Sequence, residues 1–100
     1  MLEDVFKNID DICMFNSKKV LEAFWKCHVS EAHFTSTSGY GYGDIGRDTV
    51  EEVYKTIFKA EDALVRTQII SGTHALTVTL FGLLRPNDIL LSITGTPYDT

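Results

Sequence analysis

The most constraining feature of this sequence is a strand, helix and strand pattern in its C-terminal half. Residues 63–70 are rich in branched side chains and end at a Ser-Gly turn, which is typical of a buried strand. An apolar segment over 73–84 predicts a helix that must end before Pro86, and the apolar run 89–93 predicts a second strand. Because a strand–helix–strand unit places its strands parallel with a right-handed crossover, the predicted fold class is α/β.

A single unit of this kind covers only one face of its two strands. All-parallel sheets carry helices on both faces, so two parallel strands do not make a stable sheet alone. The 100 residues are therefore expected to be the N-terminal part of a larger α/β domain.

The region before this unit is predicted to be helical, with one irregular loop. Apolar residues recur at helical spacing over 2–13 and again over 17–29, and Asn16-Ser17 between them indicates a short joint. A further helical stripe ends at Phe58 and is expected to begin at an N-cap on Asp48 or Thr49.

These patterns give three segments: an N-terminal helical segment over 1–34, a Gly/Tyr-rich loop over 35–47, and the incomplete start of the α/β domain over 48–100.

The Gly/Tyr-rich loop is the first candidate functional feature. Its residues 35–46 hold four glycines, and no helix or strand period fits them, so the backbone is expected to need unusual φ values. A flexible linker is the simpler interpretation. Tyr40, Tyr42 and the following Arg47 favour a ligand-binding loop instead.

The second candidate feature is the turn Ser71-Gly72-Thr73, between the first predicted strand and its helix. The first turn of a helix has unpaired N–H groups and a partial positive charge, and it therefore binds anions such as phosphate. Gly72 would allow close approach, and the two flanking hydroxyls could bind phosphate oxygens. A capped turn without ligand is the alternative, and His74 beside it is expected to pack rather than to bind phosphate.

Composition excludes several classes of function. A net charge of −5, with no cluster of basic residues, argues against nucleic-acid binding. Cys13 and Cys27 lack the spacing of a metal site and are expected to be reduced, largely buried thiols. The absence of a secretory signal and of an apolar run of about 20 residues predicts a cytoplasmic protein without a membrane partner.

Five ordered motifs carry a resemblance to a known family. They are TSGYGYGDIGRD at 37–48, EDALVR at 61–66, SGTHA at 71–75, LRPND at 84–88 and TGTPYDT at 94–100. Together they resemble the methionine γ-lyase-like, or aluminium resistance protein, family of pyridoxal-phosphate enzymes, within the Cys/Met metabolism group of fold type I. Asn87 stands where this family usually has glycine, and asparagine tolerates the same left-handed conformation.

The resemblance implies a pyridoxal 5′-phosphate (PLP) site. It implies that Ser71, Gly72 and Thr73 hold the cofactor phosphate and that Tyr98 stacks on the pyridine ring. It also implies that Tyr42 or Tyr40, with Arg47, reaches the phosphate of a neighbouring subunit, in a homodimer or homotetramer.

The activity that the resemblance implies is that of a carbon–sulfur lyase acting on a small sulfur-containing amino acid. Such chemistry needs a lysine that binds the cofactor covalently. The six lysines lie on polar helix positions or before the first predicted strand, so no catalytic residue is expected in this segment and the chain alone is expected to be inactive. The alternative is a small acidic protein-interaction module without catalytic activity.

Overall fold

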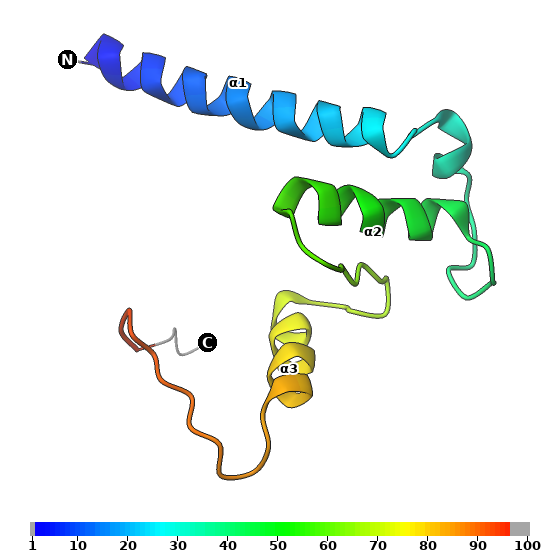
Figure 1. The fold of residues 1–100 in the computed structure, drawn as a ribbon, viewed down its shortest axis with the longest axis vertical. Helices are drawn as coiled ribbons and strands as arrows, with labels where there is room; N and C mark the ends of the chain where they lie inside the picture. Colours follow the sequence, from blue (N-terminus) through cyan, green and yellow to red (C-terminus); the bar gives the residue numbers. More distant parts are fainter. Residues whose placement is uncertain (1, 97–100) are drawn as a thin grey trace. The chain divides into compact units, whose positions relative to one another are not determined.

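The computed structural model describes residues 2–96. The chain divides into two compact units, and the boundary between them in the sequence falls between Thr67 and Gln68. The first unit contains α1 (Leu2–Lys26), the short 3-10 helix η1 (Glu31–Phe34) and α2 (Ile45–Phe58), and the second contains α3 (Gly72–Leu83) (Figure 1).

The predicted α/β class is wrong for this chain. Within residues 2–96 every regular element is a helix, and neither 63–70 nor 89–93 forms a strand. A strand exists only where a neighbouring backbone accepts and donates its hydrogen bonds. Here the Val65 amide donates instead to the Glu51 carboxylate at 2.9 Å, and the Ala63 amide donates to the Asp62 carboxylate. Branched side chains alone therefore did not produce strands, and residues 67–68 form a turn instead.

The N-terminal region is one continuous helix, so the predicted joint at Asn16-Ser17 and the separate second helix over 17–29 are wrong. Asparagine and serine inside a helix cost only a fraction of a kilocalorie each, roughly 0.5 kcal/mol relative to alanine. Acidic Glu3 and Asp4 in the first turn and Lys26 in the last turn complement the helix dipole.

The C-terminal part of α1 packs on α2 (Figure 1). Ala23 on α1 and Val53 on α2 are the buried hydrophobic residues among those described, at 1% and 5% exposure. The Cys27 thiol lies 3.7 Å from the Thr56 hydroxyl at the same contact. Cys27 is half-buried at this contact, whereas Cys13 is exposed, so the predicted burial of Cys13 is wrong.

Helix α2 begins earlier than the predicted N-cap at Asp48 or Thr49. Asp44 is the N-cap, and its carboxylate accepts a hydrogen bond from the Arg47 amide at 3.0 Å. The Thr37 hydroxyl donates to the other carboxylate oxygen, and Asp44 is buried. The hydrogen bond from the Arg47 amide, followed by that from Thr37, lowers the pKa of Asp44 below its ordinary value.

This lowered pKa predicts an acid sensitivity of the first unit. Because the folded-state pKa of Asp44 lies below that of the unfolded chain, its stabilising effect is present above about pH 4 and is lost as the pH falls through the folded value. We expect the urea midpoint to fall more for the natural chain than for Asp44→Asn between about pH 6 and about pH 3, since asparagine also caps helices but does not titrate. An equal fall of the urea midpoint in the two proteins would contradict the lowered pKa of Asp44.

The second unit contains α3 and the turn that follows it. As predicted, the helix stops before Pro86, and Asn87 adopts a left-handed conformation with φ of 80°. The Asp88 amide donates to the Arg85 carbonyl at 3.0 Å and closes the turn. Within residues 68–96 no residue is buried, so this unit is held by local hydrogen bonds rather than by a core.

Candidate functional site

The predicted phosphate-binding turn forms the N-terminus of α3. Ser71 is the N-cap with extended backbone, and its hydroxyl oxygen accepts a hydrogen bond from the His74 amide at 3.0 Å. Its carbonyl accepts the first intrahelical bond, from the Ala75 amide. Since an N-terminal turn has more N–H donors than intrahelical acceptors, the amides of Gly72 and Thr73 are the groups that an approaching anion would meet.

The surroundings of this turn suit an anion. A Cβ added at Gly72 would meet no atom within 4 Å, and no acidic residue lies in the first turn of α3. Ser71 and Thr73 are exposed, and the Ser71 hydroxyl, which accepts from the amide of His74, keeps its own hydrogen for donation. The donor set therefore fits a phosphate group.

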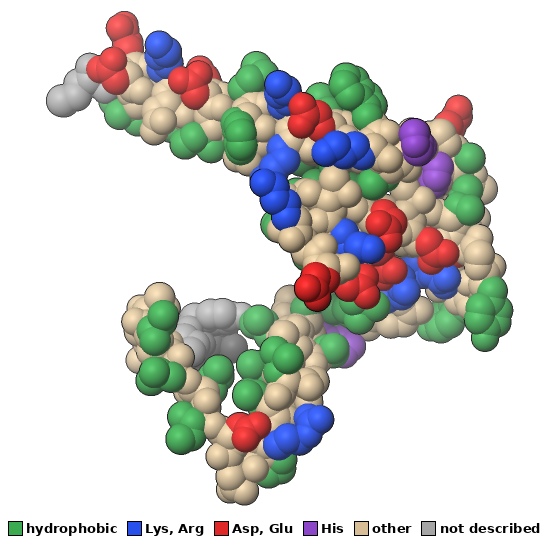
Figure 2. All heavy atoms as spheres, viewed as in Figure 1, with side chains coloured by type: hydrophobic (Ala, Val, Ile, Leu, Met, Phe, Trp, Pro, Cys, Tyr) green, Lys and Arg blue, Asp and Glu red, His purple; other side chains and the backbone are tan. Residues whose placement is uncertain are grey.

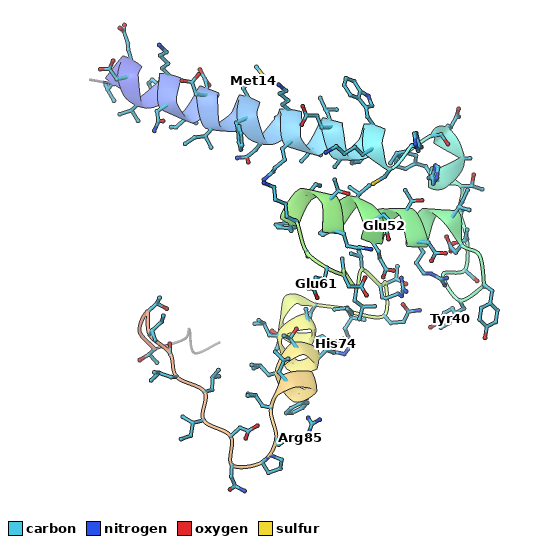
Figure 3. All side chains as sticks on the ribbon, viewed as in Figure 1. Met14, Tyr40, Glu52, Glu61, His74 and Arg85 are labelled. Atoms are coloured by element: carbon cyan, nitrogen blue, oxygen red, sulfur yellow. The ribbon has the colours of Figure 1, made fainter. Side chains whose placement is uncertain are left out.

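His74 lies beside this turn and makes a contact of its own. Its Nδ1 atom lies 3.4 Å from the amide nitrogen of Ile70, which donates to it, and the side chain is half-buried (Figure 3). The expected packing role of His74 stays a prediction.

The Gly/Tyr-rich loop has the backbone that its glycines predict. Gly39 and Gly43 adopt positive φ values of 75° and 70°, which confirms the expected unusual conformations at these two positions. Tyr40 and Tyr42 are strongly exposed, and Figure 3 shows Tyr40 pointing away from the helices. The loop therefore presents its aromatic side chains outward.

The side chain of Arg47 donates hydrogen bonds to the backbone of this loop. Its Nη1 atom donates to the carbonyl of Gly41 at 2.9 Å and lies 3.4 Å from that of Gly39. Its Nε atom pairs with Asp48 at 3.0 Å, and its side chain is only 22% exposed. The sequence pointed to Arg47 as a phosphate ligand, and the structure adds a role in shaping the loop.

The predicted site residues fall into separate groups. Tyr42 and Arg47 belong to the first unit, and the turn Ser71-Gly72-Thr73 belongs to the second. Tyr98 lies outside the described residues.

Sequence reasoning missed two polar clusters in the first unit. The first is the pair of Thr37 and Asp44. The sequence does contain a signal for it, because an aspartate whose carboxylate can bind the amide three residues later is typical of an N-cap. The second is Glu51, whose carboxylate pairs with Arg66 and accepts the Val65 amide. No local pattern indicates this second cluster, because Val65 and Arg66 lie fourteen and fifteen positions after Glu51.

Other kinds of site find no support in the described part of the chain. No group of three or more His, Cys, Asp or Glu residues within 2–96 is arranged to hold a metal ion. No helix in the same range is both long enough and apolar enough for a bilayer crossing.

Comparison with known proteins gives consistent matches over nearly the whole chain. The family model described as methionine gamma-lyase matches residues 1–100. The uncharacterized protein YnbB of Bacillus subtilis (strain 168) is 55% identical over 96 residues, which are 96% of this chain and 23% of YnbB.

Solved structures agree with this match. A protein of Listeria monocytogenes, provisionally named as a cystathionine beta-lyase involved in aluminum resistance, is 59% identical with a TM-score of 0.89, over 97% of this chain and 25% of its own. A carbon-sulfur lyase involved in aluminum resistance from Clostridium novyi is 56% identical with a TM-score of 0.87, over 95% of this chain and 23% of its own. The chain thus spans about a quarter of the length of these relatives.

Proposed function

Because the chain belongs to the methionine gamma-lyase family, we propose that it supplies the phosphate-binding part of a PLP-dependent carbon–sulfur lyase. The observation that carries this proposal is the N-terminus of α3, where Ser71 caps the helix and the space around Gly72 is open. The relatives named as lyases support the reaction class.

The residues of the turn would hold the cofactor through its phosphate. The amides of Gly72 and Thr73 donate to phosphate oxygens, and the hydroxyls of Ser71 and Thr73 add further donors. When bound, PLP supplies an electron-withdrawing ring that stabilises negative charge on the substrate. The role of Tyr98 in stacking on that ring is part of the same proposal.

Arg47 and Tyr42 would serve a second phosphate, that of a neighbouring subunit. Arg47 uses Nε for Asp48 and Nη1 for the loop carbonyls, so Nη2 is the part of its guanidinium that would meet a phosphate oxygen. Binding the loop carbonyls fixes the guanidinium before the ligand arrives, which reduces the entropy lost on binding.

The lysines of the described chain are unsuited to covalent catalysis. Lys7, Lys18, Lys19 and Lys26 lie on α1, Lys55 on α2, and Lys59 at the end of α2. Lys55 donates to Glu52 at 2.8 Å, and this bond raises its pKa, whereas a nucleophilic lysine needs a lowered one. We therefore propose that the 100-residue chain is inactive alone and that the lyase reaction uses a lysine from elsewhere.

One experiment with two arms tests this function. In the first arm, this chain replaces the matching segment of the Listeria monocytogenes relative, and we expect the chimera to bind PLP and to cleave cystathionine to an α-keto acid. In the second arm, the 100-residue chain with added PLP is expected to give no more product than free PLP. A chimera that folds without binding PLP, or an active isolated chain, would contradict the proposal.

A further inference from the structure

A pocket of about 310 Å³ lies in the first unit, between the C-terminal half of α1 and the end of α2. Three lysines of α1 and the lysine at the C-cap of α2 line it: Lys18, Lys19, Lys26 and Lys59. Glu22 is the one carboxylate among the described residues of the lining, so positive charges there exceed negative ones by three. Figure 2 shows basic side chains gathered where these parts of α1 and α2 adjoin. We refer to this site as the lysine pocket.

Such a concentration of positive charge is unusual for this chain. The net charge is −5, yet four of the six lysines line one pocket. Within residues 2–96 no carboxylate pairs with Lys19, Lys26 or Lys59. Lys55, which lies outside the pocket, is by contrast bound to Glu52 at 2.8 Å. The pocket therefore gathers ammonium groups that the described chain does not neutralise.

The fourth lysine, Lys18, is only weakly neutralised. Its ammonium lies 3.9 Å from the carboxylate of Glu22, and the two side chains are 75% and 49% exposed. A lysine that precedes a glutamate by four helical positions is in the less favourable order, and exposed pairs of this kind contribute little. Lys18 is therefore available to an external anion.

Helix dipoles explain only part of the lysine pocket. Lys26 lies in the last turn of α1 and Lys59 at the C-cap of α2, where a positive charge offsets the negative end of the helix. Lys18 and Lys19 lie about two turns before the end of α1, and the effect of the dipole falls off within the last turn. Lys19 is also half-buried. Binding of an anion accounts for the position of these two lysines, which the dipole does not.

The pocket also has apolar surface. Ala23 is 1% exposed, Ile57 is half-buried, and the more exposed Phe15 adds an aromatic ring. The hydroxyl of Thr56, 3.7 Å from the Cys27 thiol, adds a polar group to the lining. A ligand that matches this surface has an anionic group and a small apolar body.

We propose that the lysine pocket binds a small organic phosphate, with its phosphate among the ammonium groups and its apolar body over Ala23 and Ile57. A phosphate group carries close to two negative charges at neutral pH and has three acceptor oxygens, so it meets several ammonium groups at once. A carboxylate has one charge to share among them. Lysine binds phosphate as a point charge and needs no fixed geometry.

The size and charge of the molecule favour a small ligand over a polyanion such as RNA. The pocket volume is at the lower end of the range for small-molecule sites, about 300–1,000 Å³. The chain outside the pocket is acidic and would repel a long polyanion. The proposal does not rest on the lyase function.

Phenyl phosphate is a suitable probe, because it carries a phosphate and a ring but no aldehyde that would react with lysine. We expect it to bind the ¹⁵N-labelled 100-residue chain with a dissociation constant of roughly 1 mM, at about 20 mM NaCl and about pH 7.5. The backbone NMR signals that shift are expected to be those of residues 15–26 and 56–59. Inorganic phosphate is expected to bind at least about threefold more weakly, since it covers no apolar surface, and phenol is expected not to bind.

Charge variants locate the site. Lys19→Gln is expected to weaken the binding of phenyl phosphate by about two- to fivefold, and Glu22→Gln is expected to strengthen it by a similar factor. Lys7→Gln and Asp10→Asn are matched controls, because they make the same charge changes on the same helix but outside the pocket. Both controls are expected to leave the dissociation constant within about 1.5-fold of the natural value. Circular dichroism checks that each variant remains helical.

Three results would overturn the proposal. The first is an absence of phenyl phosphate binding up to about 20 mM, or shifts confined to residues outside the pocket. The second is an equal effect of the pocket and control variants, which would assign the binding to the overall charge of the chain. The third is inorganic phosphate that binds as tightly as phenyl phosphate, which would exclude an organic ligand.

Discussion

Gly72→Val is expected to weaken PLP binding by roughly ten- to several-hundred-fold in the chimera with the Listeria monocytogenes relative, whereas His74→Ala is expected to have little effect. The physical reason is the donor set at the start of α3, where charge-assisted bonds from backbone amides contribute about 1.5–3 kcal/mol each. A valine side chain at Gly72 would occupy the space that a phosphate needs, and loss of one such bond, or of two of the weaker ones, gives that range.

The structure indicates that an effect of Gly72→Val on PLP binding would not come from misfolding. A Cβ at Gly72 meets no atom within 4 Å, so the substitution is not expected to disturb the unit itself. Gly72 is also outside the left-handed region, so flexibility alone does not explain a glycine there. Titration of each apo-chimera with PLP gives the two dissociation constants. If Gly72→Val binds like the unsubstituted chimera and His74→Ala does not, the phosphate lies elsewhere.

A second large effect is expected at Gly46, in the first turn of α2. A Cβ at this position would come far inside van der Waals contact of the His33 backbone carbonyl oxygen on η1. Backbone cannot move aside as a flexible side chain would, so Gly46→Ala is expected to destabilise the first unit by about 1–3 kcal/mol. At a helical position with free space around it, replacing glycine by alanine would instead stabilise the unit, since alanine favours the helix over glycine by up to about 1 kcal/mol.

Urea unfolding of the 100-residue chain, followed by circular dichroism, measures this effect. Gly41→Ala is the matched control, because a Cβ at Gly41 meets nothing within 4 Å and its φ is not left-handed. We expect the control to unfold at nearly the natural midpoint. A Gly46→Ala protein as stable as the control would show that η1 and α2 do not pack as closely as described.

The comparison of sequence and structure shows which signals are local. The start of α3 was predicted within one residue, because Ser71 caps the helix through an amide only three positions away. The turn at Asn87 was predicted for the same reason, from a proline and a residue that tolerates positive φ. Signals that act within one turn of the chain can be read from the sequence.

The predictions that failed depend on distant partners. Residues 63–70 have strand composition, but a strand also requires a paired neighbour, and the Glu51 side chain takes the Val65 amide instead. The start of α2 was missed because Asp44 lies inside a glycine-rich loop, and one of its carboxylate oxygens accepts a hydrogen bond from Thr37, seven positions away. The contacts of Arg47 with loop carbonyls were likewise invisible, since any residue could supply those carbonyls.

That last feature has a consequence for how the loop can diversify. Arg47 contacts main-chain oxygens at Gly39 and Gly41, and main-chain oxygens are the same whatever side chains flank them. The side chains of Tyr40 and Tyr42 are strongly exposed and contribute nothing to those bonds. Replacing either tyrosine is therefore expected to change the exposed side chains of the loop and to leave its backbone conformation unchanged. The exposed side chains of the loop can therefore vary without loss of the backbone contacts that Arg47 makes.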